Sequence, residues 1–274
     1  MLFPEVTHAG ADLGYTLFME ALFPYLLPYL ILTSWLIRIS ATSTTISYFT
    51  FLQTYFISAI GGFPTGAATI VQLTKQQALT KRQAAYLLGI CHSPSPLFLF
   101  GFVGQDLLQS TTFSWYYLLL IHSFSLCLLT IVYRILRSDP SQLIPFKKEA
   151  TPFSNSSRDS APTILTVAIT LIFFTTIYHV VIYSLEQFTN VSIAFKLFAA
   201  SLLEMTNGLA TVQQHLSGDL LLFWCVVLLT TQGLSIHLQV IVIARTAQLS
   251  IRPYVAIRAI YSLCIPLLYV LFFM

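Results

Sequence analysis

Long apolar segments are the feature that most constrains the fold of this chain. A membrane-spanning helix needs roughly 20 consecutive apolar residues, and most of these segments are that long. Only 8% of the residues are charged, against about a quarter in soluble globular proteins, so the chain cannot cover itself with a polar surface. The segments fall at about 15–37, 44–73, 84–104, 112–134, 162–185, 190–209, 219–244 and 254–274.

The hydrophobicity inside each segment is nearly continuous, as it is in helices buried on all sides. In hydrocarbon every backbone N–H and C=O must find a partner within its own segment, and a helix provides those partners. The strict alternation of a membrane β-barrel is absent from the sequence. We therefore predict an all-α fold, a polytopic transmembrane helical bundle.

One polar stretch divides the apolar segments into two sets. Residues 134–162 are rich in serine, proline and charged side chains, a composition typical of loops. We therefore predict a first transmembrane half, a polar linker loop and a second transmembrane half, at 1–136, 137–161 and 162–274.

Two short sequences echo one another across that linker. Residues 77–88 read QALTKRQAAYLL, and residues 247–260 read AQLSIRPYVAIRAI. Both give leucine, a hydroxyl residue, one further residue and arginine, followed by an apolar helix. Weak repeats of this kind are common in the two halves of secondary transporters, so we expect two related halves.

The positive-inside rule bears on how those halves are oriented. The linker and the basic residues at 75–82 favour the cytoplasm, but a plain count of crossings then puts the basic cluster at 245–252 outside. If the chain around 204–208 only dips into the membrane and returns, that cluster lies inside and the repeats become parallel. Inverted repeats are common in transporters with broken helices, so we expect Lys81 and Ser250 on opposite membrane faces.

Glycine and proline interrupt several apolar segments. A helix break that faces lipid would leave backbone groups without partners, so such breaks are tolerated where they are buried in protein or line a wet cavity. We therefore predict broken or re-entrant helices that meet near the bilayer midplane. The breaks are FPYLLPY at 23–29, GGFPTGA at 61–67, CHSPSPLF at 91–98, LEMTNGL at 203–209 and TTQGLSIHLQ at 230–239.

Two of these breaks predict helices that begin inside the membrane. A residue before proline is pushed out of the helical region, and serine followed by proline suits the N-cap and first helical positions. Ser95 and Pro96 therefore predict one helix start, and Pro64 after the glycine pair predicts another. Helix N-termini carry free N–H groups and partial positive charge, and can bind an anion without a basic side chain.

Polar side chains accompany the breaks and complete the candidate site. Glu204 stands inside an apolar run, where an ionisable group is costly and is a functional candidate by default. We expect Glu204 and His237 to carry a coupling proton and the hydroxyl and amide groups to orient a solute. The predicted substrate-binding residues are Gly62, Pro64, Thr65, Gly66, Ser93, Ser95, Pro96, Glu204, Thr206, Asn207, Ser235, His237 and Gln239; no catalytic or metal-binding residue is predicted.

Five stretches together resemble a known family. They are ALFPYLLPYLIL at 21–32, GGFPTGA at 61–67, SPSPLFLFGFVG at 93–104, LLEMTNGL at 202–209 and GLSIHLQV at 233–240. The chain resembles the sporulation integral membrane proteins of the YlbJ type, which include SpoVV-like members, and more distantly the nucleoside-recognition or gate domains of transporters. The family pattern has tyrosine in place of Phe63 and a second glycine in place of Gln232. The resemblance implies a permease-like protein of the cell membrane that moves dipicolinate, a small aromatic dicarboxylate, during spore formation.

We expect a multi-pass membrane transporter of a small anionic organic solute. The alternative is a non-transporting membrane scaffold or sporulation assembly protein that binds a partner protein, which predicts dry, well-packed breaks. An intramembrane enzyme is disfavoured, because the sequence shows no nucleophile–base set and no phosphate loop, HExxH or GxSxG motif. The expected partners are the solute and the lipid bilayer, with homo-oligomer formation left open and no nucleic acid, cofactor or metal.

Overall fold

The computed structural model describes residues 3–39, 47–137 and 152–274, and within these ranges it contains helices and no strands. Two of the elements, η1 and η2, are wide π-helical stretches. The elements are α1 (Pro4–Thr16), η1 (Leu17–Leu22), α2 (Phe23–Ile39), α3 (Tyr48–Gly61), α4 (Thr65–Lys75), α5 (Lys81–Ile90), α6 (Pro96–Phe98), η2 (Leu99–Leu107), α7 (Thr112–Leu136), α8 (Pro152–Glu186), α9 (Ile193–Leu203), α10 (Met205–His215), α11 (Gly218–Thr231), α12 (Gly233–Arg245) and α13 (Arg252–Phe273).

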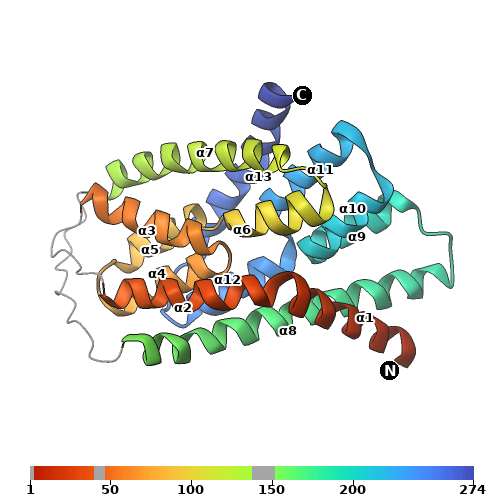
Figure 1. Cartoon of the computed structure of the whole chain (residues 1–274), viewed down its shortest axis with the longest axis horizontal. Helices are drawn as coiled ribbons and strands as arrows, with labels where there is room; N and C mark the ends of the chain where they lie inside the picture. Colours follow the sequence, from red (N-terminus) through yellow and green to blue (C-terminus); the bar gives the residue numbers. More distant parts are fainter. Residues whose placement is uncertain (1–2, 40–46, 138–151) are drawn as a thin grey trace.

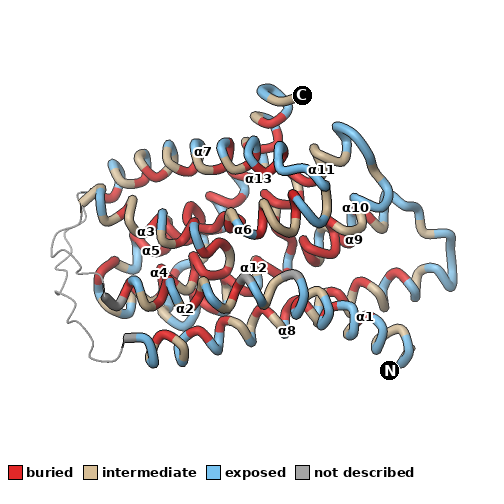
Figure 2. The backbone as a smooth tube through the Cα atoms, in the orientation of Figure 1, coloured by how far each residue is buried: buried red, intermediate tan, exposed pale blue. Residues whose placement is uncertain are grey.

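Four helical stretches of the described chain are long and apolar enough to cross a membrane, namely Thr112–Leu136, Phe153–Glu186, Gly218–Arg245 and Arg252–Phe273. Large apolar side chains are exposed on α7 and α13, such as those of Leu119 and Leu263. Figure 2 shows that exposed positions recur along α7. Water would not favour such faces on two neighbouring helices. The all-α prediction is confirmed for the described residues, and these helices indicate a membrane protein.

Most helices run along the long axis of the molecule, so their termini gather at two ends (Figure 1). The left end in Figure 1 holds the C-termini of α2, α4, α7 and α12 and the N-termini of α3, α5, α8 and α13. We call it the basic end, because its described cations are Lys75, Lys81, Arg82, Arg134, Arg137, Arg158, Arg245 and Arg252. We call the opposite end the acidic end, because it carries Glu5, Asp12, Asp106, Glu186 and Asp219.

The prediction that Lys81 and Ser250 lie on opposite faces is wrong. The Lys81 Nζ donates a hydrogen bond to Gln248 Oε1 at 2.9 Å, so the α4–α5 and α12–α13 connections lie at the same end. The two echoing sequences therefore form the N-termini of α5 and α13, which begin side by side and run in the same direction (Figure 1). They cannot be the equivalent segments of an inverted repeat.

The predicted break at 23–29 is also wrong, because the chain remains helical there. The π-helical η1 precedes it, and α2 carries Pro28 in its interior. A wide π turn absorbs extra chain within a helix and commonly accompanies a bend. Packing against α8 supports this region, since Leu26 and Leu30 share a small apolar core with Val167.

The predicted linker loop at 137–161 is wrong over its second part. Residues 138–151 lie outside the described residues, but α8 begins at Pro152 and continues through Pro162 to Glu186. Serine side chains bond to carbonyls one turn earlier, as Ser160 does to Ser156 at 2.8 Å. Both of those serines are buried, so contact with neighbouring helices keeps helical a stretch whose composition favours a loop.

The other four predicted breaks are confirmed as helix ends. The chain turns back on itself at 62–64, so that α3 and α4 form a helical hairpin, and it does the same at Glu204 between α9 and α10. The α3–α4 hairpin opens toward the basic end and the α9–α10 hairpin toward the acidic end (Figure 1). Two further stretches, α5–α6–η2 and α11–α12, run from end to end with a break between their parts.

Candidate functional site

The first hairpin tip contacts the break of α5–α6–η2, and we call this contact the first crossing. Gly62 has φ 67° and ψ −163°, a conformation available essentially only to glycine. A Cβ on Gly62 would collide with the backbone nitrogen of Ser95 and lie 2.7 Å from its Cβ. Ser95 caps the next helix, because its Oγ accepts from the Phe98 N–H at 3.1 Å. The predicted start at Ser95 and Pro96 is therefore confirmed.

Helix α4 starts from the same contact. Pro64 stands at its N-cap position without a side-chain cap, so the predicted helix start near Pro64 is confirmed. Gly66, in the first turn of α4, lies so close to the Cys91 carbonyl that a Cβ would collide with it. The N-termini of α4 and α6 are thus packed together, and α6 continues directly into η2 as one helical stretch.

The second hairpin tip contacts the break of α11–α12, and we call this contact the second crossing. Glu204 is extended, with φ −147° and ψ 122°, and caps α10 through an Oε2 that accepts from the Asn207 N–H at 2.7 Å. Gln232 and Gly233 both have positive φ, 69° and 67°. A Cβ on Gly233 would lie 3.4 Å from the Glu204 nitrogen, so backbone again meets backbone. This tip carries an ionisable side-chain cap, whereas the tip of the first hairpin, at Pro64, has no side-chain cap.

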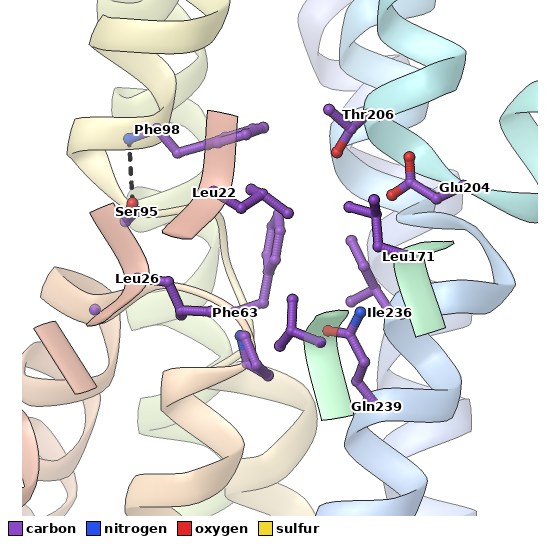
Figure 3. A pocket seen from close by; sticks show the side chains of 13 residues that line it. Leu22, Leu26, Phe63, Ser95, Phe98, Leu171, Glu204, Thr206, Ile236 and Gln239 are labelled. Atoms are coloured by element: carbon purple, nitrogen blue, oxygen red, sulfur yellow. Dashed lines mark hydrogen bonds between the residues drawn. The ribbon is translucent and has the colours of Figure 1, made fainter. Parts of the chain in front are cut away.

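A small central cavity of about 40 Å³ lies between the two crossings. Figure 3 shows Ser95 and Phe98 on one side of it and Glu204 and Thr206 on the other. Such a volume holds about three water molecules, so it is narrower than an organic solute. The lining residues are Leu22, Leu26, Gly61, Phe63, Pro64, Ser95, Phe98, Val167, Leu171, Glu204, Thr206, Ile236 and Gln239.

The structure brings five of the predicted binding residues to this cavity. They are Pro64, Ser95, Glu204, Thr206 and Gln239. Gln239 is held in place by two bonds from its Nε2, to Thr170 Oγ1 at 2.9 Å and to Ser235 Oγ at 3.4 Å. The cavity therefore combines one carboxyl, two hydroxyls and one amide with an otherwise apolar wall that includes Phe63.

Seven other predicted residues lie behind this wall or at its edges. Gly62, Gly66 and Pro96 shape the first crossing, and Ser235 supports Gln239. Thr65, Ser93 and Asn207 are buried, and their side chains carry a polar atom without a hydrogen-bond partner among the described residues. None of the seven lines the central cavity.

His237 lies apart from the central cavity. Its Nδ1 is 2.7 Å from the Tyr254 hydroxyl, and its Nε2 is 2.8 Å from the Thr231 carbonyl oxygen. Both ring nitrogens are thus engaged in holding α12 against α11 and α13. The geometry gives His237 a packing role and offers nothing for the predicted role in proton coupling.

Arg258 is a buried charged residue that the sequence reasoning missed. It is 3% exposed in α13, and it and Glu204 are the buried charged residues of the described chain. The signal was present, because a charge inside the apolar segment 254–274 meets the same criterion that singled out Glu204. Because Arg258 lies close to the basic cluster at 245–252, the sequence does not distinguish it from the cations at the helix end.

A second, larger cavity of about 660 Å³ opens at the basic end. It is lined by parts of α2, α4, α8 and α12 and contains Lys75 and Arg158. Ser34 and Thr69 line it with buried hydroxyl oxygens that have no partner among the described residues. Unpaired buried hydroxyls that line a roomy cavity are where water or a polar ligand binds.

Within residues 3–39, 47–137 and 152–274, no three His, Cys, Asp or Glu side chains gather as metal ligands would. The chain also has no match among protein-family models, curated proteins or solved structures. The resemblance to the sporulation membrane proteins therefore stays a prediction, and the functional argument depends on the site itself.

Proposed function

We propose that the chain is a multi-pass transporter of a small anionic organic solute, and that the central cavity becomes its binding site when the surrounding helices separate to widen it. One observation carries this proposal: two helix breaks from opposite ends of the molecule meet a single cavity, and both bring polar groups to it. Breaks in transmembrane helices are tolerated where they are buried in protein or line a wet cavity, and these two breaks are packed against protein and also reach a cavity. In secondary transporters the substrate site lies where discontinuous helices meet near the midplane.

The first crossing supplies the feature that favours an anion. The N-termini of α4 and α6 both end at the cavity wall, at Pro64 and Ser95. Helix N-termini stabilise negative charge through the helix dipole and backbone N–H groups. Phe63 and Phe98 line the same wall, and their rings suit an aromatic or other apolar body attached to the anionic group.

Glu204 explains how transport is coupled to protons. A solute carboxylate and an ionised Glu204 would place two negative charges in one small, largely apolar cavity, at a high cost in free energy. Protonation of Glu204 removes that repulsion and leaves a hydrogen-bond donor. The anion therefore binds together with a proton, and transport is fastest when the side from which the solute enters is acidic.

The basic-end cavity is the approach to the site, and in this conformation a layer of apolar contacts separates the two cavities. Both cavities lie between α2, α4, α8 and α12, with Leu26, Pro64, Val167 and Gln239 around the central one. About one turn further along each helix are Leu30, Ala68, Thr163 and Val242 of the basic-end cavity. The charged residues of this entrance are Lys75, Arg158 and Asp159, a net positive set that would attract anions. Separation of the Leu26, Leu30 and Val167 contact would open the passage.

The path of the chain supports two inverted halves. The elements that correspond between these halves are not the two similar sequences at 77–88 and 247–260. In the first half a hairpin, α3–α4, opens to the basic end, then α5–α6–η2 and α7 each run from end to end. In the second half the hairpin α9–α10 opens to the acidic end, then α11–α12 and α13 run from end to end. We infer that the hairpins are re-entrant and that α8 corresponds to α1–α2.

Orientation follows from the same arrangement. The described cations concentrate at the basic end and the described carboxylates at the acidic end, so the positive-inside rule places the basic end in the cytoplasm. From the sequence, inverted repeats placed the basic cluster at 245–252 outside the cell, in conflict with the positive-inside rule. With α9–α10 as a re-entrant hairpin and the new pairing, the inverted arrangement and the charge rule agree.

The scaffold alternative predicted dry, well-packed breaks. The four polar side chains at the central cavity and the large basic-end cavity favour transport over that alternative. Dipicolinate and a role in spore formation come from the resemblance alone, so dipicolinate is the first solute to test.

The test is uptake by the purified chain in sealed lipid vesicles. We expect saturable uptake of labelled dipicolinate, or of another small aromatic or aliphatic carboxylate in a screened panel, above that of protein-free vesicles. An acidic exterior should accelerate it. Uptake of no carboxylate, or uptake of uncharged nucleosides only, would contradict the proposed substrate class.

A further inference from the structure

The guanidinium of Arg258 lies where two helix breaks present their carbonyl groups. Its Nη1 donates to the His92 carbonyl at 3.0 Å, and its Nη2 donates to the Thr230 carbonyl. The charged group also stacks 4.8 Å from the centre of the Tyr261 ring, a cation–π distance. No carboxylate of the described chain reaches it, so carbonyl oxygens and an aromatic face alone meet its charge.

Those carbonyls are at the C-terminal ends of two half-helices. His92 directly follows the C-cap of α5, Cys91, and Thr230 belongs to the last turn of α11. The C-terminus of a helix carries partial negative charge and carbonyls without intrahelical partners. Two such ends that converge inside an apolar bundle need a cation or donors between them. Gln232 adds one donor, from its Nε2 to the His92 carbonyl at 3.2 Å.

Broken-helix transporters commonly place a coupling cation such as sodium at unwound carbonyls and half-helix C-terminal ends. Here that position is filled by a side chain of the protein itself. We propose that Arg258 is a tethered cation, a positioning residue that holds the ends of α5 and α11 together in place of a bound metal ion. This proposal concerns the assembly of the two breaks and holds whether or not the chain transports a carboxylate.

Arg258 lies close enough to the candidate site to affect how the cavity wall is positioned. The His92 ring contacts Phe63, with ring centres 5.7 Å apart, and Phe63 lines the central cavity. The guanidinium therefore lies behind the cavity wall and fixes the breaks that form it. The N-terminal ends of α4 and α6 face the cavity, while the C-terminal ends of α5 and α11 are neutralised on the far side.

The test is chemical rescue in the purified full-length chain. Arg258→Ala removes the cation and leaves a space of guanidinium size between the two carbonyls. We expect its thermal unfolding midpoint in detergent to fall by several degrees, and 10–50 mM guanidinium chloride, roughly a hundredfold below denaturing concentrations, to restore most of that loss in a saturable way. Choline chloride at equal concentration should restore none.

Arg252→Ala is the matched control, because Arg252 is an exposed arginine of the same helix; its midpoint should neither fall nor respond to guanidinium. If Arg258→Ala cannot be purified in sodium chloride, the readout becomes recovery of monodisperse protein solubilised with guanidinium, which the tether predicts. A stable Arg258→Ala variant, or a destabilised one that guanidinium neither stabilises nor recovers, would overturn the tethered cation and leave a packing role.

Discussion

The two crossings contain the same two parts, a glycine and a side-chain cap, but these parts lie on opposite partners and the caps differ in charge. At each, a hairpin tip meets a broken helix through a glycine, Gly62 against Ser95 in the first and Gly233 against Glu204 in the second. At each, a side chain of the contact caps a helix that starts at the cavity. The cap is the neutral hydroxyl of Ser95 in the first crossing and the carboxyl of Glu204 in the second.

If the cavity binds the proposed anion, this difference gives its two walls different roles. A neutral cap leaves the N-termini of the first crossing free to attract negative charge at any pH. A carboxyl cap makes the second crossing attractive or repulsive according to its protonation. In the transporter proposed above, an anion bound between them would be attracted by the first wall at any pH and by the second wall only when Glu204 is protonated.

The largest expected effect tests whether the crossings are inverted, and it is all-or-none. Single cysteines replace Lys81, the first residue of α5, or Ser250 or Ser217, which lie in connections between helices; all three positions are exposed. Because Lys81 bonds to Gln248, cysteines at 81 and 250 should react with an impermeant thiol reagent on the same membrane face. A cysteine at 217, in the α10–α11 connection at the acidic end, should react on the other face.

Labelling at 217 on the same face as 81 would contradict the inverted arrangement of the two hairpins, because the second hairpin would then open toward the basic end. Labelling at 81 and 250 on opposite faces would contradict the contact between their connections.

The next effect compares the two glycines. Gly62→Ala forces a side chain onto the Ser95 backbone in a conformation reserved for glycine, and should cost about 3 kcal/mol or more. Gly233→Ala meets its nearest atom, the Ser201 carbonyl oxygen, at 3.2 Å, and should cost about 1–2 kcal/mol for its positive φ. Thermal unfolding midpoints in one detergent would rank the two. A reversed ranking would mean that the second crossing is the tighter contact.

The third effect concerns the carboxyl cap. Glu204→Gln keeps a hydrogen-bonding side chain at the α10 cap but cannot ionise. Solute uptake by the parent chain should fall as pH rises, by up to about tenfold per pH unit where one proton limits binding, and the variant should lose that dependence. Initial uptake rates between pH 5 and 8 give the two profiles.

Glu186→Gln is the control, because that carboxyl pairs with Lys196 at the acidic end, away from the cavity; its pH profile should match that of the parent chain. A pH dependence kept in Glu204→Gln would remove the proton-coupling role.

The smallest effect is the loss of the neutral cap. Ser95→Ala removes the acceptor for the Phe98 N–H and should lower stability by about 1 kcal/mol. Uptake should weaken while its pH profile keeps its shape, because the titrating group remains. A changed pH profile in Ser95→Ala would show that the two walls do not act separately.

The breaks could be predicted from sequence because their chemistry is local. A Ser-Pro pair restricts the backbone by sterics, and a glycine pair before proline cannot continue a membrane helix. The starts of α4 and α6 therefore followed from the residues at 61–67 and 91–98. The break expected at 23–29 failed because Pro24 falls in the first turn of α2, directly after the π turn, and Pro28 is tolerated inside α2, where packing against α8 supports the helix.

The contacts between helices that are far apart in the sequence could not be predicted in this way. The echo between 77–88 and 247–260 pointed to equivalent segments, yet those segments lie at the same end because α9–α10 folds back instead of crossing. For a similar reason, Arg258 was not singled out and His237 was expected at the binding site. Whether a polar side chain lines a cavity or bonds to a carbonyl depends on which helix packs against it, and that is decided by contacts between residues far apart in the chain.

The most direct test of the account asks whether the cavity between the crossings is reached by water from the membrane surface. Thr206→Cys is introduced on the α10 wall of the cavity, in a chain whose native cysteines, Cys91, Cys127, Cys225 and Cys264, are replaced by alanine. The account predicts reaction with a small impermeant thiol reagent, faster from the basic face, and slowed by a transported carboxylate. No reaction from either face, while a cysteine at 81 reacts fully, would mean a permanently dry cavity and would contradict transport through this site.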